Sequence, residues 1–131
     1  MRWLKSIMCG AMGTALIGAA HAHHSFNMYD YSTDKPLAGT VKLFTWANPH
    51  GLIELVVPQP SGAAKTWNIE LSSPNILGRR GWSSHSLHVG ENLKVTVHPM
   101  RNGRPVCLLV NVTTPDGTQL SDSAGAIKKD E

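Results

Sequence analysis

Alternating apolar and polar residues mark five segments of the chain as β-strands. In each segment apolar side chains recur at every second position, which is the period of a strand with one buried face. The predicted strands are residues 37–46, 52–57, 66–71, 93–98 and 106–113. The predicted inward positions of the last four strands are Ile53, Leu55 and Val57; Trp67, Ile69 and Leu71; Leu93, Val95 and Val97; and Val106, Leu108, Val110 and Val112.

The first predicted strand carries apolar groups on both of its faces. The two faces are Val41, Leu43 and Thr45 on one side and Lys42, Phe44 and Trp46 on the other. This composition is typical of a barrel strand whose outer face is partly covered. The polar, aromatic-bearing segment that precedes it, residues 23–36, is the candidate cover, and we refer to this segment as the arm.

One short helix is predicted between the third and fourth strands, within residues 72–82. Ser73 is placed to cap its first turn, and Pro74 fits the first helical position, where no N–H is needed. Arg79 and Arg80 fall in the last turn, and Gly81 ends the helix. Three strands, a helix and two strands form the order of an OB-like barrel. The predicted fold class is therefore all-β, a five-stranded OB-like barrel with one helix between strands three and four.

The chain of 131 residues is long enough for one domain. Residues 1–22 have the charged start, apolar run and small-residue cleavage pattern of a secretory signal peptide, with cleavage expected after Ala22 and, as the alternative, after Ala20. The barrel domain is predicted at 37–118, and a polar, disordered tail at 119–131. The expected location is the periplasm or the exterior, with no membrane span after cleavage.

The charge and the cysteine content limit which binding partners and which disulfide bonds we expect. The formal charge is +3, but the signal peptide holds two of the twelve basic residues, which leaves ten against nine acidic ones. This balance gives no electrostatic reason to expect a nucleic-acid partner. Cys107 is the only cysteine of the mature chain, so no internal disulfide is expected, and we predict a packed thiol inside a strand.

Several short motifs, taken in order, carry a family resemblance. They are His23-His24-Ser25-Phe26, Trp46-Ala47-Asn48-Pro49-His50, Ser73-Pro74-Asn75 with Leu77 and Arg79, Gly81-Trp82, Ser86-Leu87 with Gly90, and Val97-His98-Pro99. With them the chain resembles the DUF6152 family of small exported bacterial proteins. The resemblance covers about His23 to Gly117, agrees with a small β-barrel and implies no reaction.

Histidines near the expected cleavage site suggest a metal site. Cleavage after Ala22 would make His23 the first residue, and its α-amine and imidazole would chelate a metal together, with His24 adjacent. Open, nitrogen-rich sites favour Cu(II) among the common divalent metals, so copper is the expected cofactor. We predict His50, in the first turn, as a further ligand and Glu70 as a carboxylate that orients it. The alternative without a metal is that all three histidines are solvated or hydrogen-bonded to the backbone.

A second metal hypothesis uses His98 and Met100, on the predicted outer face and in the turn beyond it. Topology places the His50 turn near the start of the helix and His98 near the opposite end of the first strand. The arm is long enough to reach either place, so the two sites remain distinct alternatives.

No catalytic motif stands out, and we expect a binding protein rather than an enzyme. The first hypothesis is copper binding through an amino-terminal histidine. The alternative is a metal-independent interaction or ligand-binding module, accessory to an exported enzyme, with a surface formed by Trp46, Asn48, Arg101 and Arg104. Trp67 and Trp82 are expected in the core.

Overall fold

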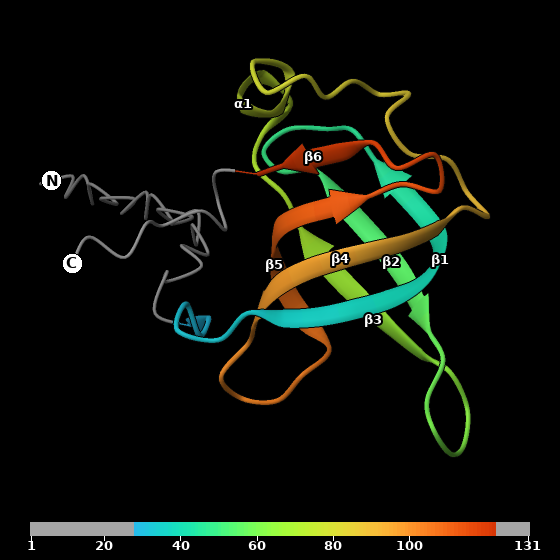
Figure 1. Ribbon diagram of the computed structural model, residues 1–131. Helices are drawn as coiled ribbons and strands as arrows, with labels where there is room; N and C mark the ends of the chain where they lie inside the picture. The colour runs from blue at the N-terminus through green and yellow to red at the C-terminus, as the bar shows by residue number, and fades with distance from the viewer. Residues whose placement is uncertain (1–27, 123–131) are drawn as a thin grey trace, which may run out of the picture.

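The computed structural model describes residues 28–122, which form a small barrel with one short helix at its upper end (Figure 1). The elements in chain order are β1 (Lys35–Thr45), β2 (Leu52–Val57), β3 (Lys65–Glu70), α1 (Pro74–Gly78), β4 (Asn92–Pro99), β5 (Val106–Thr113) and β6 (Gln119–Ser121). No helix in this part of the chain is long and apolar enough to cross a membrane.

The strands form one sheet in the order β3-β2-β1-β4-β5-β6, closed by a pairing between β3 and β5. The closing pair is parallel, with Asn68 opposite Val106, and the other pairs are antiparallel. The long strand β1 pairs with β4 through its first half and with β2 through its second. This arrangement confirms the predicted five-stranded OB-like barrel with its helix between β3 and β4.

The predicted faces of β2, β3 and β4 are confirmed. Their inward residues are buried and belong to one continuous core with Leu77 of α1 and Trp82 behind it. Cys107 is a buried free thiol in the same core, as predicted. Burial and the Glu70 carboxylate raise the pKa of the Cys107 thiol to about 12.

The predicted faces of β1 are wrong beyond Val41. The pairing with β2 shifts between Val41 and Leu43, where one extra residue lies in β1. Such a bulge reverses which side chains point inward from that point on. Phe44 and Trp46 therefore pack against the core, whereas Leu43 is 42% exposed.

A second bulge makes the predicted faces of β5 wrong over most of its length. Val97 of β4 lies opposite Leu109 and Thr96 opposite Asn111, so Val110 is the extra residue. Before this bulge the core receives Cys107 and Leu109 instead of the predicted Val106, Leu108 and Val110. The prediction holds only for Val112, which lies beyond the irregularity and is fully buried.

Helix α1 is shorter than its sequence pattern suggests. Ser73 precedes it and accepts the Leu77 N–H through its backbone carbonyl at 3.0 Å, but its side chain makes no capping bond. Arg79 is the residue that ends the helix, so the predicted placement of basic residues in the last turn is wrong. Gly81 does adopt a left-handed φ of 87°, as expected for a residue that reverses the chain.

The barrel extends beyond the predicted boundary at residue 118. Residues 119–121 form β6, which pairs with β5, and the Trp82 indole N–H donates to the Ser121 carbonyl at 2.9 Å. Asp122 is fully buried, and its carboxylate accepts the Ser72 N–H at 2.7 Å. The expectation of a disordered tail from 119 is thus corrected for residues 119–122, and residues 123–131 lie outside the described part.

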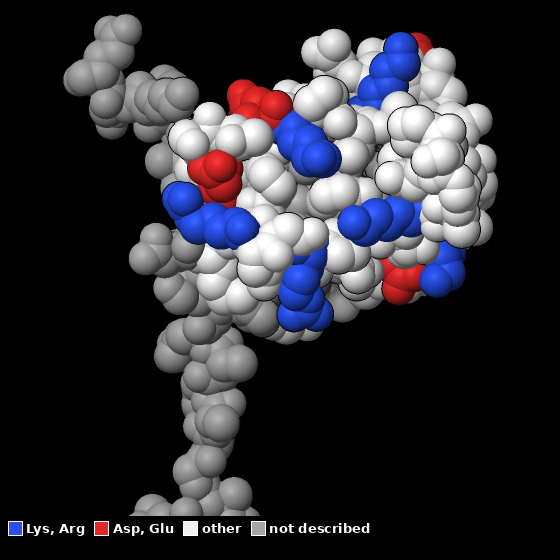
Figure 2. Space-filling model, turned by 90° about the horizontal axis from the view of Figure 1, so that it is seen from below, with Lys and Arg blue, Asp and Glu red and all other residues white. Residues whose placement is uncertain are grey.

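The end of the barrel away from α1 carries the β2–β3 loop and the β4–β5 turn. Figure 2 views the molecule from this side and shows Lys and Arg side chains spread across it, with Asp and Glu side chains beside several of them.

Candidate functional site

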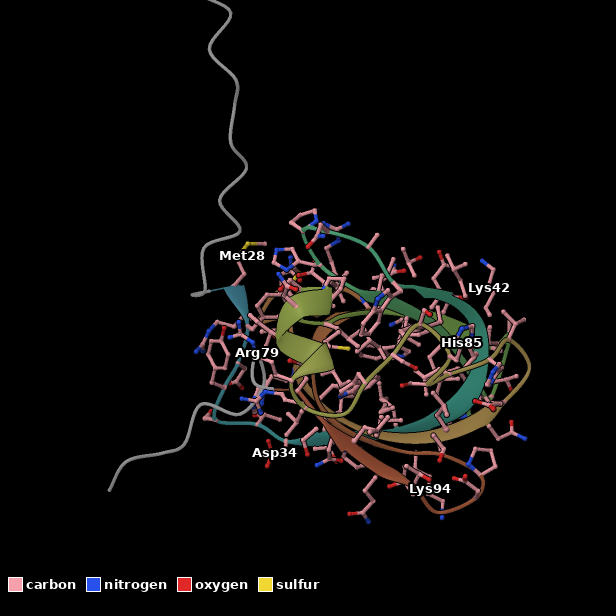
Figure 3. All side chains as sticks on the ribbon, turned by 90° about the horizontal axis from the view of Figure 1, so that it is seen from above. Met28, Asp34, Lys42, Arg79, His85 and Lys94 are labelled. Carbon is pink, nitrogen blue, oxygen red and sulfur yellow. The ribbon has the colours of Figure 1, made fainter. Side chains whose placement is uncertain are left out.

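The described part of the arm, residues 28–34, is hydrogen-bonded to the carboxyl end of β4 and to the turn that follows it. Tyr29 forms an isolated antiparallel bridge with Met100. The Arg101 N–H donates to the Met28 carbonyl, and the Asp30 N–H donates to the Pro99 carbonyl, both at 2.8 Å. Met28 and Asp34, the two ends of this segment, lie on the same side of the barrel (Figure 3).

Beneath the arm lies a second apolar cluster, separate from the barrel core. We call it the arm cluster; its buried members are Tyr29, Met100 and Leu108, and Met28, Tyr31 and Val106 pack against them. The face that the arm covers therefore belongs to β4 and β5, whereas the sequence suggested a cover for the first strand. This burial explains how outward-facing apolar residues of β5 avoid water.

His98 is buried beside this cluster, which corrects the expectation that it is not an interior residue. It does point outward from β4, but only 4% of it is exposed because the arm lies over it. Its Nδ1 is 3.0 Å from the Thr33 carbonyl oxygen and 3.4 Å from the Asp34 carboxylate. Since a carbonyl only accepts, Nδ1 carries the proton. The Tyr31 ring meets the imidazole edge-on at 5.3 Å between centroids.

Glu70 and His98 flank the arm cluster in one register row. Glu70 of β3 lies opposite Leu108 of β5, which lies opposite His98 of β4. Burial, followed by the Glu70 carboxylate, raises the pKa of Tyr29. The hydroxyls of Tyr29 and Tyr31 are buried without a hydrogen-bond partner in the described structure. Glu70 therefore lies closer to the arm than its predicted role beside His50 implies.

His50 is exposed at the α1 end of the barrel. Its neighbour Gly51 donates its N–H to the Ser72 carbonyl at 3.1 Å, which confirms that this turn lies beside the start of the helix. Glu70 also borders this turn, because its partner in β2 is Leu52. His23 and His24 lie outside the described residues. Within residues 28–122 there is no group of three or more His, Cys, Asp or Glu side chains placed to hold a metal ion.

The four residues of the predicted ligand surface fall into two separate places. Trp46 packs against the core and meets Phe44 edge-on at 6.1 Å, and Asn48 is exposed in the turn after β1. Arg101 and Arg104 are exposed in the turn after β4. Since β1 and β4 are antiparallel, these two turns lie at opposite ends of the barrel.

A shallow cleft of about 350 Å³ lies between the segment before β4 and the β5–β6 turn. His85, His88, Glu91 and Asp116 line part of it. The His88 Nδ1 is paired with the Glu91 carboxylate at 3.0 Å. Hydrogen bonds from the Thr114 hydroxyl and from Thr118 lower the pKa of Asp116 to about 2. These bonds are each formed within a single turn, and the groups do not converge on the cleft.

Sequence reasoning missed the arm cluster. Tyr29 and Tyr31 showed only as aromatic residues in a polar segment, and their partners are about 70 residues away along the chain. The available hint was that a polar segment with two tyrosines and a methionine has apolar groups that need cover.

Comparison with known proteins agrees with the resemblance found in the sequence. The model of DUF6152, a family of unknown function, matches residues 12–109. No curated protein and no solved structure matches the chain.

Proposed function

The chain belongs to the DUF6152 family of unknown function, and from this premise we propose that it is an exported binding protein that takes copper at its amino terminus. Cleavage after Ala22 would leave His23 with a free α-amine next to its imidazole. An amine with a pKa near 8 is readily deprotonated by a metal at neutral pH, and two or three nitrogens in a plane suit Cu(II). His24 adds a second imidazole beside the chelate.

The observation that carries this proposal is the fastening of the arm at Met28. Five residues separate the expected terminus at His23 from the hydrogen bond between Met28 and Arg101. Five residues span at most about 17 Å, so the proposed terminal chelate stays close to the barrel. A tethered chelate has a high effective concentration for any further ligand on the barrel surface.

His50 is the further ligand that the geometry favours. It is exposed, and it lies two residues before Leu52, the partner of Glu70, whose carboxylate raises the pKa of Tyr29 in the arm. His98 is less suitable, because its Nδ1 is engaged by Thr33 and its ring is buried. Met100 is likewise packed in the arm cluster. Copper binding at His98 and Met100 would require the arm to move away from these two side chains.

The test is titration of Cu(II) into protein whose amino terminus has been established by mass spectrometry. A matched sample with one alanine ahead of His23 removes the terminal chelate but keeps every side chain. We expect tight one-to-one binding that is weakened at least tenfold in the extended sample and less strongly in His50→Ala. Equal binding in all three samples would refute the proposal. If Cu(II) binds strongly to the extended sample but not to His98→Ala, the site is at His98 and Met100.

The second candidate is a metal-independent interaction module that assists an exported enzyme. It is favoured by the exposed pair Arg101 and Arg104 in a turn that is rigidly joined to the arm by the Arg101 N–H. A module of this kind would retain its partner in the presence of a chelator and lose it in Arg101→Ala or Arg104→Ala. Loss of the partner on chelation would exclude it in favour of copper.

A further inference from the structure

Two lysines lie on one tryptophan ring at the end of the barrel away from α1. The Nζ of Lys35 is 5.3 Å from the centroid of Trp67, and the Nζ of Lys65 is 5.5 Å from it. The two ammonium groups are therefore at most about 11 Å apart, and both are in the range of cation–π attraction. We call Lys35, Lys65 and Trp67 the lysine mouth.

Strand periodicity explains why both lysines lie near Trp67. Lys35 begins β1 and shares a face with Leu37, which packs on the core. Lys65 begins β3 and shares a face with Trp67, which is 8% exposed. The ammonium of Lys35 also opposes the rise in the pKa of Cys107, which places its charge towards the interior. The nearly buried Trp67 indole thus has an ammonium group near it from each of two strands.

These two charges have no carboxylate partner in the described part of the chain. The ion pairs there are Lys42 with Glu54, His88 with Glu91, His98 with Asp34 and Arg101 with Asp30. Asp34, the residue next to Lys35, is directed to His98 instead. Two like charges held at one ring repel each other, and cation–π attraction offsets this only in part.

The β4–β5 turn, which carries two further basic residues, is joined to the strand of Trp67. The turn that carries Arg101 and Arg104 is joined to β3 where the Asn68 N–H donates to the Pro105 carbonyl at 2.9 Å. Asn68 directly follows Trp67 in the chain. Figure 2 looks onto this end and shows Lys and Arg side chains spread across it, with acidic ones beside several of them. A doubly charged anion placed between the lysines would therefore gain from two ammonium groups and from the field around them.

We infer that the lysine mouth is a binding site for a divalent oxyanion, a sulfate or phosphate group, seated between Lys35 and Lys65 at the edge of the Trp67 ring. The group is either a free ion or an ester on a larger ligand. Ammonium groups bind such oxyanions as point charges with charge-assisted hydrogen bonds. The site uses none of the residues proposed for copper and does not rest on that proposal.

The test follows the indole N–H resonance of Trp67 by NMR as sulfate or phosphate is added at constant ionic strength, with chloride as the balancing salt. We expect a saturable shift of Trp67, while the indole N–H of Trp82, which is bonded to Ser121, stays in place. Lys65→Gln and Lys35→Gln should each weaken binding about tenfold, the loss of one charge-assisted contact. Lys94→Gln, an exposed lysine on β4, is the matched control and should bind as the wild type does.

A parallel titration with a sulfated or phosphorylated oligosaccharide distinguishes the two sources of the group. Tighter binding of the oligosaccharide than of the free ion identifies an ester ligand, and the reverse identifies a free ion. The inference is overturned if chloride alone reproduces the shift, if neither form binds, or if Lys94→Gln weakens binding as much as Lys65→Gln does. Thermal unfolding of each variant shows whether a loss of binding comes from misfolding.

Discussion

Gly39 of β1 is predicted to be the least replaceable glycine in the barrel. A Cβ at this position would overlap the carbonyl oxygen of Val56 and lie 2.9 Å from its carbonyl carbon and 3.1 Å from the Leu55 Cγ. The first two obstacles are backbone atoms of the neighbouring strand, which move only if β1 and β2 separate. Gly39 is also paired with Leu93 of β4, so β1 has no free side towards which to move.

The magnitude follows from this geometry. Forcing an extra methyl group into a packed site costs about 1–3 kcal/mol, and the upper part of that range applies where the obstacle is backbone. Replacing glycine by alanine also restricts the unfolded chain, which stabilises the protein by about 0.4–1 kcal/mol. The net expectation for Gly39→Ala is a loss of about 2 kcal/mol. For a domain of this size that loss lowers the Tm by about 8–16 °C.

The matched control is Gly78→Ala in α1. No atom lies within 4 Å of a Cβ built there, and the residue is helical. Alanine should therefore stabilise the protein by about 0.5–1 kcal/mol. Urea unfolding measures both changes in stability, provided that the slope of the unfolding free energy against urea concentration is the same in each variant. The two changes should have opposite signs. If the midpoint of Gly39→Ala equals that of the wild type or of Gly78→Ala, the close approach of β1 and β2 is wrong.

The remaining predictions concern buried polar groups and the strand that the sequence did not reveal. Asp122→Ala leaves the Ser72 N–H buried and unpaired, so it should cost about 2–3 kcal/mol in urea unfolding; a cost below about 0.5 kcal/mol would contradict the contact. Burial raises the pKa of Cys107 from 9.0 to about 12, so the folded state keeps a proton that the unfolded state releases. Stability should be complete below pH 9 and fall by at most about 1.4 kcal/mol per pH unit towards pH 12, less steeply in Cys107→Ala; identical profiles would argue against this cause. Trp82→Phe removes the bond to Ser121 and should cost about 1 kcal/mol. Amide exchange in β6 should then speed up more than exchange in β2, and an equal increase in both would mean that β6 is not held by Trp82.

The fold could be predicted wherever side-chain alternation was regular. In β3 and β4 the inward residues were found correctly because one face of each strand is apolar and the other polar, whereas in β2 Glu54 alone marks the outward face. In β1 and β5 both faces are apolar, so the pattern carried no information about the extra residues at Val41–Leu43 and at Val110. A bulge shifts the register by one position and leaves the composition unchanged, so single-sequence reasoning has nothing with which to detect it.

The burial of the arm and of β6 depends on contacts between distant residues. His98 was judged by its position on the outer face of β4, which was correct, but the arm that covers it is about 65 residues away in the chain. Asp122 looked like part of a polar tail because nothing near it in the sequence shows that Ser72 needs an acceptor. For the candidate site, strand order alone placed the turn of His50 beside α1, whereas the proximity of Glu70 to Tyr29 required the closed barrel.

The closure of β3 against β5 also has a consequence for how fast the protein folds. The hairpin of β1 and β2 is local, but the barrel is complete only when Asn68 meets Val106 and Lys35 meets Val97. Domains dominated by such distant pairings fold in about milliseconds to seconds, because a long loop must be ordered before its contacts form. The chain therefore remains open until β4 and β5 have been synthesised.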